Sequence, residues 1–448
     1  MAHSRFRAVL YACAVALATL SSAPSRAADS TQTSERLHQL ELQNQQLQEQ
    51  LRRQQELIES LSRKVNEIQE TNTQRGKELE NLQAEMKEPA PAAKNSGAFS
   101  LSKVSISGEG SVGFFWGGSE SAYPNPEFRV DEARLFVEAP IWNNIYFFSE
   151  IDLMTPEAQN LSVQLGELYL DFENVSRLWD RDRMLNVRAG RMYIPFGEEY
   201  QTRYAIDNPL IARSITDIWG VDEGLELYGK LDKVSYVVAV QNGGPSGVAD
   251  FNGDKSVAGR LSYDPARWLH LSASGMRTGD LTPPGDYWSE LYFSNGWFPP
   301  SASTNTSTFH ANLVEGDLEF RLPRGHIKTF GGYVRYDGND SAAGSSRDLY
   351  YYSVEVVHDL INKLYAGARF GQIFAHNGFP IAANGDMNKY FFSGTLTDEI
   401  WRLSLCLGYR WSENLILKTE YTFERGKTTD GNSRNHEDLF AVQAAFKF

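Results

Sequence analysis

From Leu101 to the end of the chain, apolar and polar residues alternate with a period of two in one segment after another. This is the period of a β-strand whose two faces meet different surroundings. The pattern predicts sixteen strands separated by turns or loops. Their expected ranges are 102–116, 127–139, 143–153, 162–172, 184–194, 222–230, 233–242, 256–263, 268–277, 306–321, 325–337, 348–358, 363–375, 397–409, 413–424 and 437–448.

The lengths of the connections follow a second alternation. Connections after even-numbered strands are mostly short, as at 140–144, 230–233 and 410–414, whereas those after odd-numbered strands are long and polar. One connection, 172–184, is longer than the others of its class. An even number of strands, with short turns at one rim and long loops at the other, is typical of an outer-membrane barrel. We therefore predict an all-β membrane barrel of sixteen antiparallel strands over 101–448.

Individual strands also predict which face meets lipid and which meets water. In 401–409 an apolar set with an aromatic residue at either end would face lipid, and this set is Trp401, Leu403, Leu405, Leu407 and Tyr409. The interior would receive Arg402, Ser404, Cys406 and Gly408 from that strand, and Arg134, Phe136, Glu138, Tyr146, Phe148, Glu150 and Asp152 from 133–153. The interior is expected to be mixed in charge and wet, because sixteen strands enclose an aqueous channel.

Charge and hydropathy exclude other classes of protein. The chain has 43 Lys and Arg against 57 Asp and Glu, a formal net charge of −14, which argues against a nucleic-acid partner. Past residue 30 no apolar run approaches the roughly 18 residues that a membrane-spanning helix needs. A helical membrane protein is therefore not expected.

The first 100 residues predict three further segments. Residues 1–28 have the layout of an export signal, with an apolar core over 8–20 that is too short for a membrane anchor. Residues 29–88 predict an α-helical coiled coil, because eleven of the fifteen seam positions of a heptad that starts at Leu37 are apolar. Residues 89–100 predict a Pro/Ala linker.

The coiled coil would lie in the periplasm. Its segment from Arg36 to Glu41 resembles a pattern found in three-stranded coiled coils, so a homotrimer is expected. A disordered polar tail is the alternative for this segment.

The end of the chain is expected to act as a barrel-assembly signal. A terminal Phe with apolar residues at every second position before it resembles the signature that the outer-membrane assembly machinery reads. The residues concerned are Phe440, Val442, Ala444, Phe446 and Phe448.

Three stretches carry a family resemblance. The sequence GRMYIPFGEE (190–199), together with GELYLDF (166–172) and GVDEGLELYGK (220–230), resembles the phosphate-selective porin O and P family over roughly 101–448. The resemblance implies a trimeric porin in the outer membrane of a Gram-negative cell, which admits small hydrophilic solutes or ions. It also implies a preference for anions such as phosphate, set by rings of Arg and Lys.

The charge of the barrel does not favour that preference. Residues 1–96 hold twelve basic and twelve acidic residues, which leaves 43 − 12 = 31 basic against 57 − 12 = 45 acidic beyond them. The solute is therefore left open.

The connection over 195–221 occupies the place where the third loop of sixteen-stranded porins folds inward and narrows the pore. Opposite charges across a narrow wet gap create a transverse field that sorts solutes. The candidate constriction residues are Glu198, Glu199, Arg203, Asp207, Arg213 and Asp217 of this loop, with Arg134, Arg188 and Arg369 of the wall. For each of them, a salt bridge that ties the loop to the wall is the alternative.

No arrangement of residues predicts catalysis or a cofactor. The histidines are scattered, and nothing in the sequence places a nucleophile beside a base. A non-enzymatic channel for passive diffusion is therefore expected. The alternative function is a tether or spacer, in which the coiled coil connects the outer membrane to the cell wall and the barrel anchors it.

Overall fold

A computed structural model describes residues 103–156, 163–244, 250, 253–279, 291–293, 296–297, 309–338 and 347–448. The predicted export signal, coiled coil and linker lie outside these residues. No helix in this part of the chain is both long enough and apolar enough to cross a bilayer.

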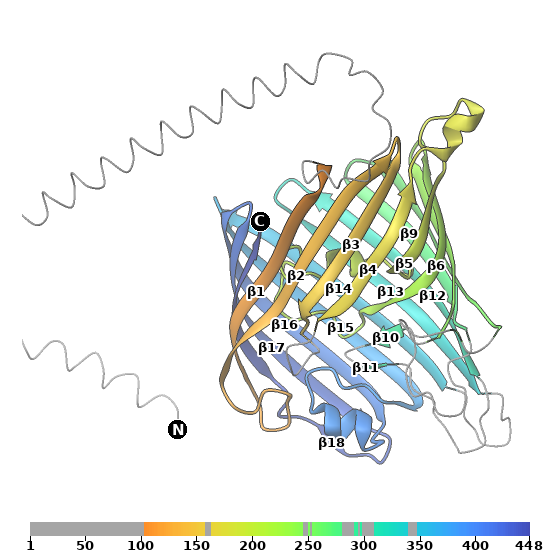
Figure 1. Ribbon diagram of the computed structural model, residues 1–448. Coiled ribbons are helices and arrows are strands. Elements are labelled where there is room, and N and C mark those ends of the chain that lie inside the picture. Colours follow the sequence, from red (N-terminus) through yellow and green to blue (C-terminus); the bar gives the residue numbers. More distant parts are fainter. Residues whose placement is uncertain are drawn as a thin grey trace, which may run out of the picture. The chain divides into compact units, whose positions relative to one another are not determined.

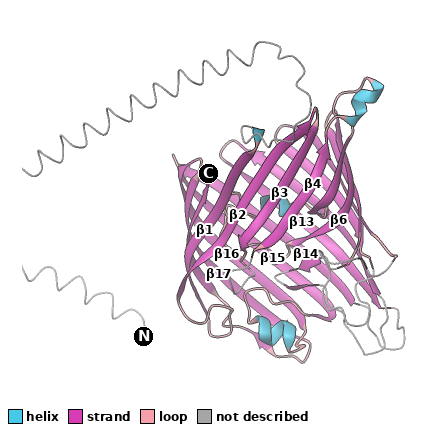
Figure 2. Cartoon of the chain, viewed as in Figure 1, coloured by secondary structure: helices cyan, strands magenta, loops and turns pink. Residues whose placement is uncertain are grey.

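Sixteen long strands of the described chain form one closed antiparallel sheet (Figures 1 and 2). They are β1 (Ser105–Gly117), β2 (Glu127–Trp142), β3 (Ile145–Met154), β4 (Gln164–Phe172), β5 (Asn186–Tyr193), β6 (Ile218–Leu231), β7 (Val234–Gln241), β8 (Ser256–Ala266), β9 (Leu269–Arg277), β12 (Phe309–Leu322), β13 (Gly325–Gly338), β14 (Arg347–Ile361), β15 (Leu364–Phe379), β16 (Thr397–Ser412), β17 (Leu415–Thr428) and β19 (Leu439–Lys447). The predicted fold class and strand number of the barrel are confirmed.

The sheet closes where β19 pairs with β1. Nine residue pairs join the two strands, from Gly117 opposite Leu439 to Glu109 opposite Lys447. Two further backbone hydrogen bonds, 2.9 and 3.1 Å long, link Phe448 and Gly108. The strand edges are therefore paired, which is the condition for a sheet to cross the apolar part of a bilayer.

Most strand boundaries fall within the predicted ranges, but some strands are longer. β6 begins at Ile218, four residues before its predicted start at 222, and β17 ends at Thr428, four residues after its predicted end at 424. Backbone pairing continues at the long-loop rim after the apolar alternation has faded, so the sequence pattern underestimates these strands.

Several short elements lie between the long strands. β10 (Leu291–Phe293), β11 (Gly296–Trp297) and β18 (Ser433–Arg434) were not predicted. The helical turns are η2 (Val175–Trp179), η3 (Glu199–Thr202) and η4 (Asn388–Phe392). η2 occupies the unusually long connection 172–184 and projects from the short-turn rim in Figure 1.

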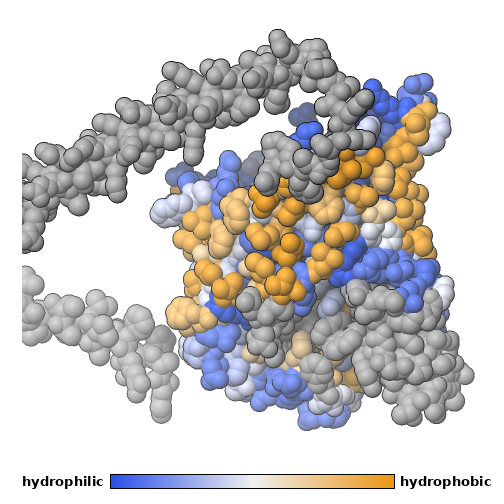
Figure 3. Space-filling view, viewed as in Figure 1, coloured by the Kyte–Doolittle hydropathy of each residue, from blue (hydrophilic) through white to orange (hydrophobic). Residues whose placement is uncertain are grey.

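The predicted faces of the strands are confirmed. In β16 the side chains of Leu405 and Leu407 are 46% and 44% exposed on the outside, whereas Cys406 between them is 6% exposed. Apolar side chains cover the outer wall over β1 to β4 in Figure 3. Exposed tryptophans mark the short-turn rim, as an interfacial aromatic belt would. They are Trp142, Trp179, Trp268 and Trp411.

A β-bulge changes the inward set of β2. Ser111 of β1 pairs with Glu132, but the next residue, Val112, pairs with Val130, so the register shifts and Asp131 is the extra residue of the bulge. The side chains of Asp131 and Glu132 are therefore both buried on the inner side of the wall, at 5% and 2% exposure. Strict alternation would have turned only one of them inward.

Candidate functional site

The segment 194–217, which we call the inward loop, connects β5 to β6 inside the barrel. It hydrogen-bonds to Glu132 of β2, Ser274 of β9, Arg369 of β15 and Glu420 of β17. Contacts with strands so far apart around the wall require the loop to lie within the cylinder. The predicted inward course of this connection is confirmed.

Two buried side chains of β17 hold the middle of the loop. The Lys418 Nζ donates hydrogen bonds to the carbonyl oxygens of Ala205, Asn208 and Leu210, at 2.7, 3.2 and 2.9 Å. The carboxylate of Glu420 accepts from the backbone N–H groups of the next two residues, 211 and 212. The ammonium group of Lys418 therefore satisfies the carbonyl groups of this turn, and the carboxylate of Glu420 satisfies its N–H groups. Capping groups do the same at the ends of helices.

Two arginines of the neighbouring strands hold the following residues. Arg369 donates to the carbonyl oxygen of Ala212 and to Asn208 Oδ1, both at 3.0 Å, and pairs with Glu355. Arg402 of β16 donates to the carbonyl oxygen of Arg213 at 2.8 Å. Arg369, one of the predicted constriction residues, thus ties the loop to the wall through hydrogen bonds, whereas its salt bridge is with Glu355 of the wall.

Arg134 of β2 lies at the centre of an acidic cluster on the inner wall. Its guanidinium contacts four carboxylates: Asp152 at 2.7 Å, Glu150 at 3.1 Å, and Glu109 and Glu132 at 3.4 Å. It also lies 4.1 Å from the ring centre of Tyr204 on the loop. A single buried arginine therefore offsets the mutual repulsion of several buried carboxylates.

The two predicted arginines of the loop both carry ion pairs. Arg213 pairs with Glu132 at 2.5 Å. Arg203 pairs with Asp217 at 3.2 Å, and its guanidinium lies 3.7 Å from the ring centre of Trp219. Arg213 thus makes the predicted alternative contact, a salt bridge from the loop to the wall, whereas the ion pair of Arg203 lies within the loop.

The predicted acidic residues of the loop lie in different surroundings. Asp207 is exposed to the lumen. Glu198 accepts a hydrogen bond from Ser262 at 3.0 Å and lies 2.9 Å from His270 Nε2. Burial alone would raise the pKa of Glu198, but the hydrogen bonds and charge of His270 and the charge of Arg260 hold it below its ordinary value.

Glu199 has the opposite electrostatic situation. Its Oε2 is buried without a hydrogen-bond partner among the described residues. Burial, reinforced by the nearby charge of Asp217, raises its pKa well above the ordinary value, and the charge of Arg369 does not compensate. The pKa values of the adjacent glutamates of the loop are therefore shifted in opposite directions.

Arg188, the remaining predicted residue, lies away from the loop arginines. It pairs with Asp171 at 3.1 Å and Glu226 at 2.9 Å and lies between the rings of Tyr169 and Tyr228. It lines a separate cavity of about 320 Å³.

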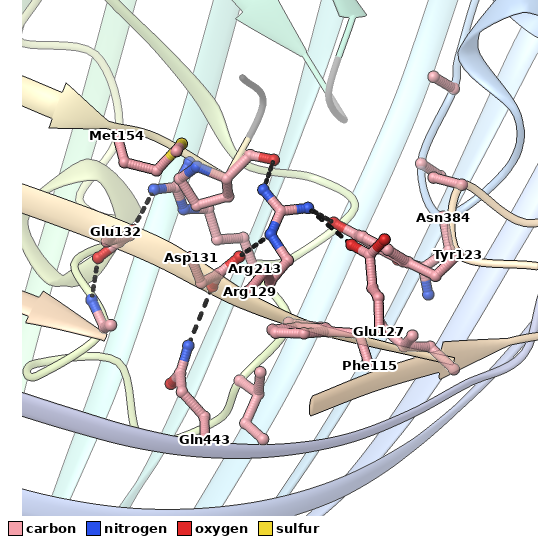
Figure 4. Close-up of a pocket in the computed structure, with 18 of the residues that line it drawn as sticks. Phe115, Tyr123, Glu127, Arg129, Asp131, Glu132, Met154, Arg213, Asn384 and Gln443 are labelled. Carbon is pink, nitrogen blue, oxygen red and sulfur yellow. Dashed lines mark hydrogen bonds and ion pairs between the residues drawn. The ribbon is translucent and has the colours of Figure 1, made fainter. Parts of the chain in front are cut away.

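A larger cavity, of about 600 Å³, lies between the inward loop and strands β1, β2, β16 and β19. Arg129, Arg203, Arg213 and Arg402 line it together with Glu127, Asp131 and Glu132. Figure 4 shows Arg129 and Arg213 with the carboxylates of β2. Opposite charges thus meet in one cavity, and across a water-filled gap such an arrangement orders water and sorts ions.

A second segment also lines this cavity. Residues 382–385 and 387 belong to the connection between β15 and β16 and face the same space. The fully buried Arg434 donates to the carbonyl oxygens of Ile381 and Ala382, at 2.6 and 2.9 Å, and pairs with Glu437. Glu424 accepts from the N–H of Asn384 at 2.8 Å. Arg434 of the short strand β18 and Glu424 of β17 therefore hold this second loop.

Several residues of this site were not among the predicted ones. They are Arg129, Asp131, Glu132, Arg402, Lys418, Glu420 and Arg434. The inward parity of Lys418 and Glu420 could be read from 413–424. The sequence could not predict which strands of the wall the loop contacts, because the contacting residues are separated by about 200 positions.

Comparison with known proteins supports the fold. No family model matches this chain, and no curated protein matches it. The solved structure of OmpT, an outer membrane protein of Vibrio cholerae, is similar with a TM-score of 0.51 at 10% identity, over 77% of this chain and 97% of that one. The outer membrane channel DcaP of Acinetobacter baumannii is similar with a TM-score of 0.50 at 14% identity, over 79% and 100%.

At these identities the likeness shows the barrel fold. Membership of the phosphate-selective porin O and P family stays a prediction.

Replacing Lys418 with methionine tests how the loop is held. The variant keeps the apolar stem but leaves three carbonyls of the loop without their charged donor. We expect the free energy of unfolding to fall by about 2–5 kcal/mol and trypsin to cleave the detergent-solubilised barrel at Arg203 or Arg213. Lys230→Met, at an exposed position of the short-turn rim, is the control. Equal resistance to trypsin in both variants would contradict this role.

The pKa shifts of the two glutamates predict opposite pH dependences. Below the unfolded-state pKa, near about 4.3, Glu199 is protonated in both states. Above that pH the unfolded carboxyl ionises while the folded one keeps its proton, so folding stability falls as pH rises toward the raised folded pKa. Glu199→Gln should therefore gain stability over the wild type as pH rises above about 4.3.

Glu198→Gln provides the control with the opposite sign. The depressed pKa of Glu198 contributes stability above the unfolded pKa, and this contribution is lost as pH falls through the folded pKa. The variant should be less stable than the wild type at pH 7, with a smaller difference at acid pH. Urea unfolding at pH 7 and at acid pH measures the difference in the free energy of unfolding between each variant and the wild type. A difference of the same sign for both variants at pH 7 would refute the assignment.

Proposed function

We propose that this chain is a porin of the Gram-negative outer membrane, which forms a water-filled channel for passive diffusion of small hydrophilic solutes. The observation that carries the proposal is the inward loop inside a closed sixteen-stranded wall. Buried charges of the wall hold the loop, and a charged cavity of about 600 Å³ lies beside it. An anchor without transport would have no need for a wide barrel with a fixed internal constriction.

Small anions, phosphate among them, are the favoured solutes in this proposal. Four arginines line the larger cavity against three carboxylates, Glu127, Asp131 and Glu132. The guanidiniums are positioned along the loop and the wall by their ion pairs, so they act as fixed positive charges next to the water path. Arg203 and Arg213 are the proposed selectivity residues of the loop, and the net balance of this cavity supports anions weakly.

The protein is proposed to work as a homotrimer. The support is the three-stranded pattern between Arg36 and Glu41, which lies outside the described residues. The tether between outer membrane and cell wall stays a prediction that rests on the coiled coil. Recognition of the terminal strand by the assembly machinery also stays a prediction, and it rests on the apolar alternation that ends in Phe448.

Planar-bilayer recording tests the pore. Full-length protein should give conductance steps in multiples of three, with a reversal potential that indicates preference for anions. Arg213→Ala should lower the anion-to-cation permeability ratio by a factor of about two to five, since one charge near the ion path contributes on the order of 1 kcal/mol in water. Arg177→Ala removes an exposed arginine from η2 at the short-turn rim and is the control.

Silent bilayers that contain correctly folded protein would overturn the pore and favour the tether. An unchanged reversal potential in Arg213→Ala would remove this residue from the selectivity machinery.

A further inference from the structure

A buried apolar cluster fills one side of the barrel in its long-loop half, and we call it the dry core. Inner side chains of β8, β9 and β12 to β16 form its wall. Those that are at most 1% exposed include Leu313, Val334, Leu349, Ile373 and Ile400. Apolar side chains that pack this closely exclude water, so this side of the lumen is sealed at the level of the dry core.

Three segments that turn into the barrel cover this wall. They are the inward loop, β10, and the end of β15 with the connection after it, and they contribute Ile194, Phe196, Ile215, Leu291, Phe293, Phe379 and Ile381. The ring centre of Phe293 lies 5.6 Å from that of Tyr351 on the wall and 6.1 Å from that of Phe379. A β-carbon at Gly371 of β15 would lie 3.2 Å from Ile215 Cγ1, so the inward loop approaches this wall closely.

The other side of the inward loop is polar and hollow. The larger cavity lies on this side and reaches Tyr123 in the long connection between β1 and β2. The smaller cavity, of about 320 Å³, is lined by residues of β4 to β8 and by Tyr200 of the loop. It reaches Ser235, next to the short turn between β6 and β7. The two cavities therefore extend toward opposite rims of the barrel.

Tyr204 of the inward loop lies between the two cavities. Its neighbours in the chain, Arg203 and Ala205, line the larger cavity, whereas Tyr193 and Tyr200 line the smaller one. The hydroxyl groups of Tyr204 and Tyr193 lie 2.9 Å apart. A solute that moves from one cavity to the other would therefore pass this side chain.

The ring of Tyr204 is held by the wall. Its hydroxyl group donates to Glu150 of β3 at 3.0 Å. The guanidinium of Arg134 on β2 lies 4.1 Å from its ring centre, and the ring centre of Phe136 on the same strand lies 6.4 Å away. Contacts with β2, β3 and β5 fix the ring in one position, so it gives the passage a fixed width.

We infer that solutes cross this barrel between the inward loop and the inner wall of β2 to β5, and that the ring of Tyr204 sets the size of the largest solute that passes. The dry core seals the opposite side of the loop, and the two cavities mark the polar route on this side. The inference rests on the proposed pore and adds to it a residue that selects by size. Neutral solutes are therefore subject to the same limit as ions.

Swelling of liposomes that contain the full-length protein tests the size limit. Tyr204→Ala should raise the entry rate of the trisaccharide raffinose, relative to that of the monosaccharide arabinose, by about threefold, because permeation through a filter depends on its diameter. Tyr204→Phe keeps the ring and should leave this ratio unchanged. Ile373→Ala shortens a side chain of the dry core and should also leave the ratio unchanged.

Thiol labelling in planar bilayers tests the route independently. In full-length protein with Cys13 and Cys406 replaced by serine, Ala212→Cys places a thiol at the larger cavity and Ala375→Cys places one in the dry core. A charged methanethiosulfonate should reduce the current through the first variant and leave the second unmodified. Both variants replace alanine with cysteine, so they differ in position alone.

The outcomes separate the route from the pore. An unchanged ratio of sugar entry rates in folded Tyr204→Ala, or equal block through Ala375→Cys and Ala212→Cys, would overturn the inference and leave the pore intact. Wild-type liposomes that admit neither sugar, together with silent bilayers, would overturn the pore and the route with it. Tyr204→Leu, which shortens the side chain but keeps an apolar contact for Phe136, repeats the size test if Tyr204→Ala does not fold.

Discussion

The backbone pairing of β19 with β1 is the constraint on which the rest of this structure depends. An unpaired N–H or C=O in the hydrocarbon region costs several kcal/mol, and an open sheet would present a row of such groups along two strands. Nine residue pairs and the two bonds of Phe448 remove both edges. Once the cylinder is closed, its inner side chains no longer meet lipid, and the alternation of the strands supplies an apolar outside and a polar inside.

The inward loop shows what the polar interior makes possible. Lys418, Glu420 and Arg402 are buried, a costly placement for charged groups unless each is paired and hydrogen-bonded. Backbone groups of the loop supply the missing partners, since they have no strand neighbour of their own. Wall and loop therefore satisfy each other's polar groups, and the inward loop is a fixed part of the barrel. Arg434 and Glu424 hold the second segment, the connection between β15 and β16, in the same way, by hydrogen bonds with its backbone groups.

Sequence periodicity predicted the wall well, because alternation is a local signal and each strand carries its own. The inward course of the loop was also predicted, from its length and position. Its contacts were not, since Ile211 and Glu420 are 209 positions apart and meet only when the cylinder closes. The bulge at Asp131 changed which carboxylates face inward, and a period of two cannot indicate where it is interrupted. The coiled coil over 29–88 stays a prediction.

Cysteine cross-linking across the closing pair of strands tests the central claim most directly. Ser111 and Ala445 are opposed in the register and buried on the inner side, and opposed side chains lie within roughly 5 Å, close to what a disulfide spans. With Cys13 and Cys406 replaced by serine, the pair Ser111→Cys and Ala445→Cys should form an intramolecular disulfide in folded protein, reversed by reductant. The displaced pair Ser111→Cys and Ala441→Cys should not. Absence of the first disulfide, or equal formation of both, would contradict a closed barrel with this register.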